Sequence, residues 1–179
     1  MGFSLFFMRI EGGSATGGGD REGLARFLDS RGLHLSDDDS CCSLLNADGS
    51  ALKLDGHSTD LNLDPLDKEG ELSGGIWHAH LGPEECQFIY DLCVAGGFII
   101  VNPQDNPLFI VVNHNHKESD IPDAGGPLAW VESADELAEV LGSPFDHFID
   151  YRDRVLATNN PAPSTPTAAK RRWWNRLWH

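Results

Sequence analysis

The sequence predicts an α+β fold: a single domain in which a mixed or antiparallel sheet is flanked by helices. Two runs, FIIVN at 98–102 and LFIVV at 108–112, are almost entirely apolar and are typical of central strands covered on both faces. Strand-like and helix-like segments follow one another irregularly, without the regular alternation of a doubly wound sheet. With 179 residues, 40% of them hydrophobic, the chain is long enough to bury the core of one domain.

The N-terminal segment predicts a strand, a turn and a helix. Aromatic and β-branched residues favour a strand over 3–10, and GGSATGGG at 12–19 indicates a flexible turn. Asp20 is a typical N-cap for a helix over 21–30, which Gly32 then ends.

Short strands separated by polar loops are predicted in the middle of the chain. We expect strands over 41–46 and 51–55, joined by the turn sequence ADGS. The polar stretch 56–75 indicates a long loop with room for one short strand. The run IWHAHL at 76–81 alternates as a half-buried strand does.

A helix over 84–95 precedes the two apolar strands. Pro83 suits its first turn, and the glycine pair that follows it is a typical stop signal. The strands 98–102 and 108–112 are joined by the hairpin-type loop PQDNP, and a polar loop over 113–126 follows them.

Two helices close the predicted domain. After a short strand over 127–131, Ser133 caps a helix over 134–141, and Glu136 completes a capping box. A separate last helix is expected over 144–156.

The composition changes after residue 157. Residues 1–157 form the expected acidic α+β domain, whereas 158–169 hold three prolines among small or polar residues and predict a disordered linker. The final segment KRRWWNRLWH at 170–179 is basic and rich in tryptophan, and it is too short to form a stable helix by itself. We expect a disordered C-terminal tail.

The charge is strongly negative. The chain has 13 Lys and Arg against 28 Asp and Glu, a net charge of −15. The tail carries four of these bases and no acid, so the rest of the chain has nine bases against 28 acids, a net charge of −19. Such a surface repels phosphate backbones, so nucleic acid is not an expected partner. It suits a basic protein partner, because complementary potentials speed encounter and select against wrong partners.

Cysteine usage and the N-terminus favour a cytoplasmic protein. The four cysteines (Cys41, Cys42, Cys86 and Cys93) form no CxxC pair, so we expect reduced thiols. The opening MGFSLFFMRIE lacks the basic segment and the cleavage site of a signal peptide, and no run reaches the length of a transmembrane helix.

Catalytic motifs are missing from the sequence. There is no GxSxG, no GxxxxGK[ST], and no GxGxxG after a strand. The glycines at 17–19 lack the following Lys-Ser or Lys-Thr of a phosphate loop. We therefore expect no enzymatic activity and no cofactor.

Two histidine pairs keep a metal-binding enzyme open as an alternative. His78 and His80 are two residues apart, and His114 and His116 repeat that spacing in NHNH. Together they could supply four imidazole ligands for a transition metal, provided that the fold brought the two pairs together.

Four stretches follow one another in a recognisable order: FSLFFMRIEGG, DREGLARFL, CQFIYDLCVAGGFIIVNPQDNPLFIVV and PLAWVESADELAEVLG. Together they resemble small acidic immunity proteins of bacterial polymorphic and type VI toxin systems. The resemblance lies in element order and texture over residues 2–157. It implies a cytoplasmic inhibitor that binds one toxin tightly, occludes its active site through an acidic surface, and has no catalytic residues of its own.

Acidic loops are the candidate contacts with such a toxin, which is expected to be basic. The candidate partner-binding residues are Asp37, Asp38, Asp39, Asp55, Asp60, Asp64, Glu118, Asp120 and Asp123.

A membrane-associated adaptor is a second alternative, and it depends on the tail. Trp173, Trp174 and Trp178 are candidate contact residues of this segment, because tryptophan favours membrane interfaces and cations favour anionic lipid. Ten residues bury little area and the acidic body opposes approach to such a surface, so any membrane contact should be weak. Docking of the tail on the body or on a partner is equally open.

Overall fold

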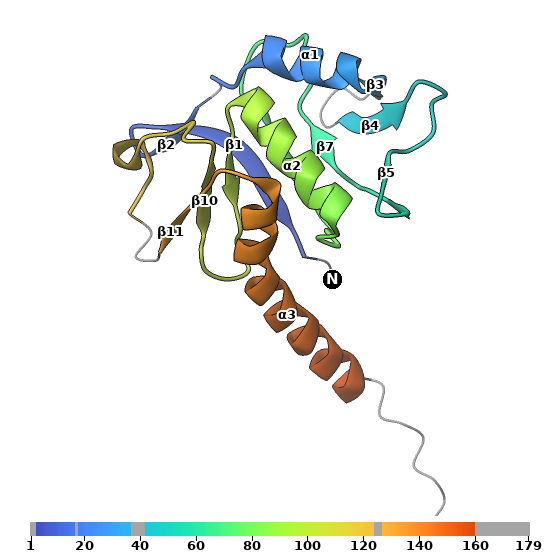
Figure 1. Cartoon of the computed structure of the whole chain (residues 1–179), viewed down its shortest axis with the longest axis vertical. Coiled ribbons are helices and arrows are strands. Elements are labelled where there is room, and N and C mark those ends of the chain that lie inside the picture. Colours follow the sequence, from blue (N-terminus) through green and yellow to red (C-terminus); the bar gives the residue numbers. More distant parts are fainter. Residues whose placement is uncertain (1–2, 17, 37–41, 124–126, 160–179) are drawn as a thin grey trace, which may run out of the picture. The chain divides into compact units, whose positions relative to one another are not determined.

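The computed structural model describes residues 3–16, 18–36, 42–123 and 127–159, and it confirms the α+β fold (Figure 1). Residues up to Phe148 form one compact unit, in which a mixed sheet is accompanied by helices. A second unit begins at Ile149, and its described part is the last portion of the final helix.

One sheet organises the first unit. Its strands are β1 (Leu5–Glu11), β2 (Ser14–Thr16), β3 (Leu33–Leu35), β4 (Cys42–Asn46), β7 (Asn62–Leu63), β8 (Ser73–Ile76), β9 (Ile99–Val101), β10 (Phe109–Val112) and β11 (Leu128–Val131). The order is β11-β10-β9-β1-β8-β7-β4-β3, with β2 paired to β1. Only β10 and β11 pair in parallel within the described sheet. A separate hairpin joins β5 (Lys53–Leu54) to β6 (His57–Ser58).

The helices are α1 (Arg21–Ser30), α2 (Pro83–Gly96) and α3 (Ala134–Asn159), with a 3-10 turn η1 at Glu118–Asp120. Two predicted caps are confirmed. Asp20 accepts the Gly23 N–H at 2.7 Å at the start of α1. Ser133 accepts the Glu136 N–H at 3.2 Å, and the Glu136 carboxylate reaches back to the N–H of Glu132 at 2.7 Å.

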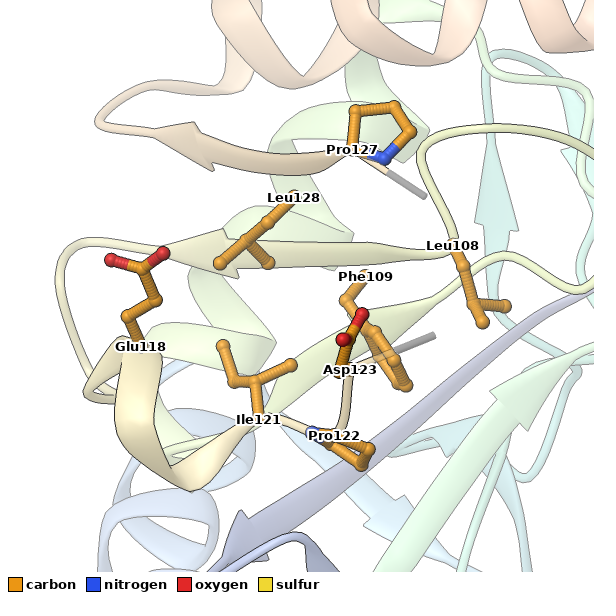
Figure 2. A pocket seen from close by; sticks show the side chains of 8 residues that line it. All are labelled: Leu108, Phe109, Glu118, Ile121, Pro122, Asp123, Pro127 and Leu128. Carbon is orange, nitrogen blue, oxygen red and sulfur yellow. The ribbon is translucent and has the colours of Figure 1, made fainter. Parts of the chain in front are cut away.

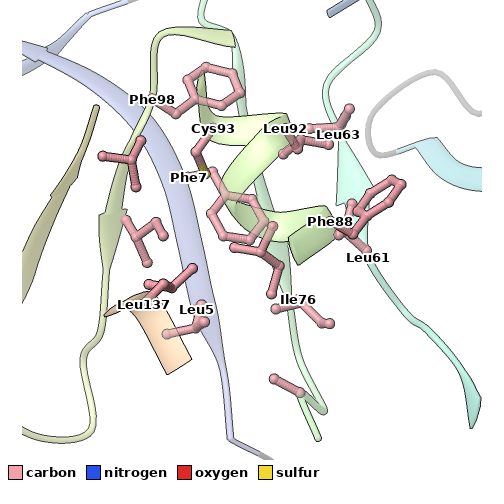
Figure 3. Close-up of a cluster of buried hydrophobic side chains, with 14 of the residues drawn as sticks. Leu5, Phe7, Leu61, Leu63, Ile76, Phe88, Leu92, Cys93, Phe98 and Leu137 are labelled. Carbon is pink, nitrogen blue, oxygen red and sulfur yellow. The ribbon is translucent and has the colours of Figure 1, made fainter. Parts of the chain in front are cut away.

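The main core lies between the helices and one face of the sheet (Figure 3). Alternate strand residues point to this face, because successive side chains of a strand point to opposite sides. Leu5 and Phe7 of β1 pack there with Leu92 and Cys93 of α2, and Leu137 of α3 joins the same cluster. The apolar runs predicted at 98–102 and 108–112 contain β9 and β10, and Ile100, Ile110 and Val112 belong to this core. Both were predicted as central strands; β9 lies inside the sheet, but β10 is next to the edge strand β11.

The opposite face of the sheet carries a smaller cluster. Ile10, Ile99 and Val111 are buried there, and half-buried Ile121 packs against them from the segment that follows β10. This face is therefore only partly covered by the described chain, and the candidate site lies on it.

His116 connects the segment that follows β10 to strand β1 by a hydrogen bond. The residue is 7% exposed, and its Nε2 accepts the Ile10 N–H at 3.1 Å. Its Nδ1 lies 2.7 Å from the side-chain oxygen of Asn115, whose amide donates to the Phe98 carbonyl at 2.7 Å. A neutral ring with the proton on Nδ1 satisfies both contacts, whereas a protonated ring could not accept from Ile10.

A pH-dependent loss of stability follows from His116. Burial, and after it the charge of Arg9, lowers the pKa of His116 below its ordinary value of 6.5, although Asp120 and Glu11 act in the opposite direction. Near and below that pH the unfolded chain binds a proton that the folded protein does not. We expect the free energy of unfolding to fall as the pH drops below about 6.5, and His116→Gln to flatten this slope. Urea unfolding from pH 7.5 to 5 measures both; equal slopes for wild type and variant would contradict the assignment, and exposed His34→Gln is the control.

The prediction of a strand over 76–81 was wrong. β8 ends at Ile76, and the following residues leave the ladder because two carboxylates take their N–H groups. Asp60 accepts from Trp77 and His78, and Glu85 accepts from His80 and Leu81. His78 and His80 consequently do not share a strand face.

Other strand predictions were also partly wrong. Residues predicted as a glycine-rich turn include β2, which pairs with the end of β1 because Gly12 and Gly13 adopt positive φ and form a tight turn. The strand expected over 51–55 is reduced to β5 and a bridge between Leu45 and Ala51. Strand β3 was not predicted. The stretch 56–75, predicted as a long loop with room for one short strand, holds β6, β7 and most of β8.

The two helices predicted after residue 133 are one helix. α3 continues through Pro144, although proline removes one backbone N–H from the helix. Packing holds this stretch in place, because Phe145 and Phe148 both lie edge-on to the buried Phe3 ring, at 5.4 and 5.8 Å between centroids. The helix also passes the expected domain boundary at 157 and ends at Asn159, while residues 160–179 lie outside the described residues.

Candidate protein-binding surface

A pocket of about 220 Å³ lies on the partly covered face of the sheet, beside β10 and β11 (Figure 2). The lining residues are Leu108, Phe109, Glu118, Ile121, Pro122, Asp123, Pro127 and Leu128. Six of these are apolar, and the two acidic residues, Glu118 and Asp123, are exposed. The pocket therefore combines an apolar lining with carboxylates at its solvent side.

An apolar row leads across the sheet to this pocket. The row consists of four half-buried residues that are neighbours in register: Leu128 on β11, Phe109 on β10, Val101 on β9 and Phe6 on β1. At the far end, Trp77 is 44% exposed and packs edge-on to Phe6 at 5.0 Å between centroids. The described chain thus leaves a row of large apolar side chains accessible along four strands.

Trp130 adds an aromatic group next to the pocket. It is 39% exposed and lies on the same face of β11 as Leu128, two residues along the strand. The His114 ring lies 5.7 Å from its ring, and Nε2 of His114 lies 2.8 Å from the Glu132 carboxylate. The edge of the sheet therefore presents an exposed indole beside a further acidic group.

We call the pocket residues together with Trp130 the β11 surface. An apolar centre with an exposed tryptophan and a polar rim is the usual anatomy of a protein–protein interface. Of the predicted contact residues, Glu118 and Asp123 line the pocket, and Asp120 lies between them in the chain, at the end of η1. Asp120 is half-buried, and its backbone carbonyl accepts the Gly13 N–H at 2.9 Å.

Asp55 lies elsewhere and caps a helix. Gly82 at the N-cap of α2 offers no side chain, and the Asp55 carboxylate accepts the N–H groups of Glu84 at 3.2 Å and Glu85 at 3.0 Å. The Glu84 carboxylate in turn accepts the Asp55 N–H at 2.7 Å. This is a reciprocal cap formed across 29 residues, so the carboxylate is engaged within the fold.

Asp60 and Asp64 are engaged in the same way. Burial opposes the charge of Asp60, but the bond with the His78 ring and the N–H groups of Trp77 and His78 outweigh it and lower the pKa of Asp60. Asp64 accepts from the N–H and the hydroxyl of Ser73, both at 2.8 Å. These carboxylates position the chain around β7 and β8, at a different part of the sheet from the β11 surface.

Several predicted contacts lie outside the described residues. They are Asp37, Asp38 and Asp39 of the acidic loop and Trp173, Trp174 and Trp178 of the tail.

The two histidine pairs have separate partners. His78 bonds Asp60, and His80 stacks on His57 at 4.6 Å between centroids. His114 bonds Glu132, while His116 is buried against β1. Within residues 3–16, 18–36, 42–123 and 127–159, no three His, Cys, Asp or Glu side chains gather where they could hold a metal ion.

The cysteines of α2 are part of the core. Cys86 and Cys93 are buried free thiols. Burial, and after it the charges of Glu85 and Asp55, raises the pKa of Cys86 to about 12, and burial also raises the pKa of Cys93. Neither thiol has the thiolate character of a nucleophile.

Sequence reasoning missed Trp130 and the apolar pocket. The strand that carries Trp130 was predicted, but the neighbours that expose it and build the pocket come from other segments of the chain. A tryptophan in a short strand between a polar loop and a capped helix was the available signal.

Comparison of the chain with protein-family models, curated proteins and solved structures finds no match. The resemblance to immunity proteins stays a prediction. Among the described helices, none has an apolar stretch sufficient to cross a bilayer.

Proposed function

We propose that this protein is a cytoplasmic inhibitor that binds a basic protein partner through the β11 surface. In this proposal the partner is a toxin of a polymorphic or type VI system, and the protein acts by occluding its active site rather than by catalysis. The observation that carries the proposal is the apolar pocket flanked by Glu118, Asp123 and the exposed Trp130.

The charge of the chain supports a basic partner. A net charge of −15 attracts cationic surfaces over a distance, and the carboxylates at the pocket oppose partners of like charge. The apolar lining then supplies the buried contact area that a tight complex requires. Long-range attraction and short-range packing therefore favour the same class of partner.

Capture with a charge-matched pair of variants tests this function. The full chain is immobilised, proteins from the source cells are captured at low salt, and any stoichiometric partner is purified for affinity measurement. We expect a 1:1 complex whose association rate falls as salt rises. Glu118→Lys should weaken it by about tenfold or more, because a rim carboxylate becomes a repulsive cation.

Glu139→Lys is the matched control. Glu139 is exposed on α3 and is not part of the pocket, so this variant changes the net charge equally without changing the β11 surface. Equal affinities of the two variants would exclude the β11 surface as the contact. Absence of any stoichiometric partner would remove the proposal itself.

A further inference from the structure

The outer edge of β11 has backbone groups that the described sheet does not use. In the parallel pair, Val131 lies opposite Val112, and its carbonyl accepts the Asn113 N–H at 2.9 Å. The N–H and carbonyl of one strand residue point to the same side, and alternate residues point to opposite sides. Ala129 and Val131 therefore face β10, whereas Leu128 and Trp130 direct their backbone groups away from the sheet.

Glu132 is the next residue whose backbone groups point away from β10, and both of its groups form hydrogen bonds within the fold. The Glu132 carbonyl accepts the Tyr90 hydroxyl at 2.6 Å, and the Glu132 N–H donates to Glu136 at 2.7 Å. No such contact is found for the backbone of Leu128 or Trp130 in the described part of the chain. Two residues of β11 thus offer two N–H donors and two carbonyl acceptors at the edge.

We propose that β11 binds an extended, basic segment of a protein partner as an additional strand of the sheet. This inference rests on the proposed function and specifies how the partner is held. The backbone of the segment would pair with Leu128 and Trp130, as in other cases of strand addition. The added strand lies about 4.8 Å from β11.

The pocket explains why this edge is favoured over the other. Leu128 lines the pocket, so alternate side chains of an added strand project on the pocket face next to it. A long cationic side chain there would place its apolar stem over the pocket and its charge near Glu118 and Asp123. The opposite edge, β3, has no residue in this pocket.

Charge also argues against a second copy of this chain as the occupant. Edge-to-edge pairing of two β11 strands would bring two molecules of net charge −15 together. Like charges across an interface oppose association, whereas a basic segment is attracted to the same edge.

Three defined peptides test strand addition on the full chain. The first is a ten-residue peptide of alternating lysine and valine, the second has glutamate in place of lysine, and the third is the lysine peptide with every second backbone nitrogen methylated. NMR titration gives affinities, and amide hydrogen exchange reports on Leu128 and Trp130. We expect the lysine peptide to slow exchange at both amides and the glutamate peptide to have no effect. Methylation should weaken binding by about tenfold, which corresponds to one or two hydrogen bonds.

A pair of variants isolates the backbone donor. Trp130→Pro removes an N–H that makes no bond to β10, and proline is tolerated at such edge positions. Trp130→Ala removes the same side chain but keeps the N–H. We expect the proline variant to bind the lysine peptide about five- to tenfold more weakly than the alanine variant.

Each contrary result has a distinct meaning. Strand addition is overturned if the methylated peptide binds as tightly as the unmethylated lysine peptide, or if Trp130→Pro binds the lysine peptide as tightly as Trp130→Ala. In that case the capture of a stoichiometric partner would still support the proposed function. Without peptide, protection of the Trp130 amide from exchange could rise with protein concentration, together with a doubling of the molecular mass. This result would make a second copy of the chain the occupant of the edge and overturn the proposal of a basic segment. Protection by the lysine peptide without any captured partner supports strand addition while the proposed function fails.

Discussion

Gly23→Ala is expected to lower the free energy of unfolding by about 3 kcal/mol, although alanine is the better helix former. A β-carbon at this position of α1 would lie 2.2 Å from the backbone carbonyl oxygen of Ala95 in α2. A backbone atom of a packed helix cannot move aside as a flexible side chain can. The two helices would have to separate, which also strains the bond from the Asp20 N–H to the Gly96 carbonyl, 2.8 Å long.

Gly142→Ala is the matched control with the opposite expected sign. Gly142 lies in α3, and a β-carbon there would meet nothing within 4 Å. The substitution should stabilise the protein by about 0.5–1 kcal/mol, because glycine loses more backbone freedom in a helix than alanine does. Urea unfolding followed by circular dichroism measures both variants. A neutral or stabilising Gly23→Ala would show that the close approach of α1 to α2 is wrong.

The sequence predicted the elements that carry their own local signals. Asp20 and Ser133 cap helices at the predicted positions, since a cap requires only a side chain and the N–H groups three residues away. The apolar runs that contain β9 and β10 were also clear, because most of their residues are buried and few polar residues interrupt the pattern.

The predictions that were wrong concern elements that depend on residues distant in the sequence. IWHAHL alternates like a strand, but Asp60 and Glu85 take its N–H groups, and no local pattern reveals this. The sequence predicted that a separate helix begins at Pro144, whereas one helix continues through it with Phe145 packed on Phe3. The candidate surface also depends on distant residues: counting acids identified Glu118 and Asp123, but the pocket and the exposed edge depend on how β10, β11 and η1 meet.

This distinction separates two kinds of acidic residue. Asp55, Asp60 and Asp64 belong to the same charge excess as Glu118, yet their carboxylates accept backbone N–H groups at defined positions. A carboxylate used in this way stabilises the fold whether or not a partner is present. The acidic composition therefore overstates the number of carboxylates that are available for a partner.

Asp55→Ala provides the sharpest test of that distinction. It removes both acceptors at the α2 N-terminus, which should cost about 1–2 kcal/mol. Asp55 also has φ of +49°, and alanine in this left-handed region should cost about 1 kcal/mol more, since Asp and Asn tolerate it better. We expect the free energy of unfolding to fall by about 2–3 kcal/mol in total.

Asparagine at this position separates the contributions. Asp55→Asn keeps an acceptor oxygen and the tolerance of positive φ, so it should lose only about 0.5–1 kcal/mol of helix-dipole interaction. Asp67→Ala, at an exposed acid, removes one charge without a cap and should change stability by about 0.5 kcal/mol or less. Urea unfolding of the three variants measures this series.

Partner affinity measured on the same proteins completes the argument. Under conditions where all variants are folded, Asp55→Ala should bind the captured partner as Asp67→Ala does, because both lose one charge away from the β11 surface. A variant that keeps its stability but loses affinity would make Asp55 a contact residue and the cap incidental. A variant that loses stability but keeps affinity would show that Asp55 stabilises the fold and does not contact the partner. The contacts with a basic partner would then be expected at Glu118, Asp123 and the exposed Trp130.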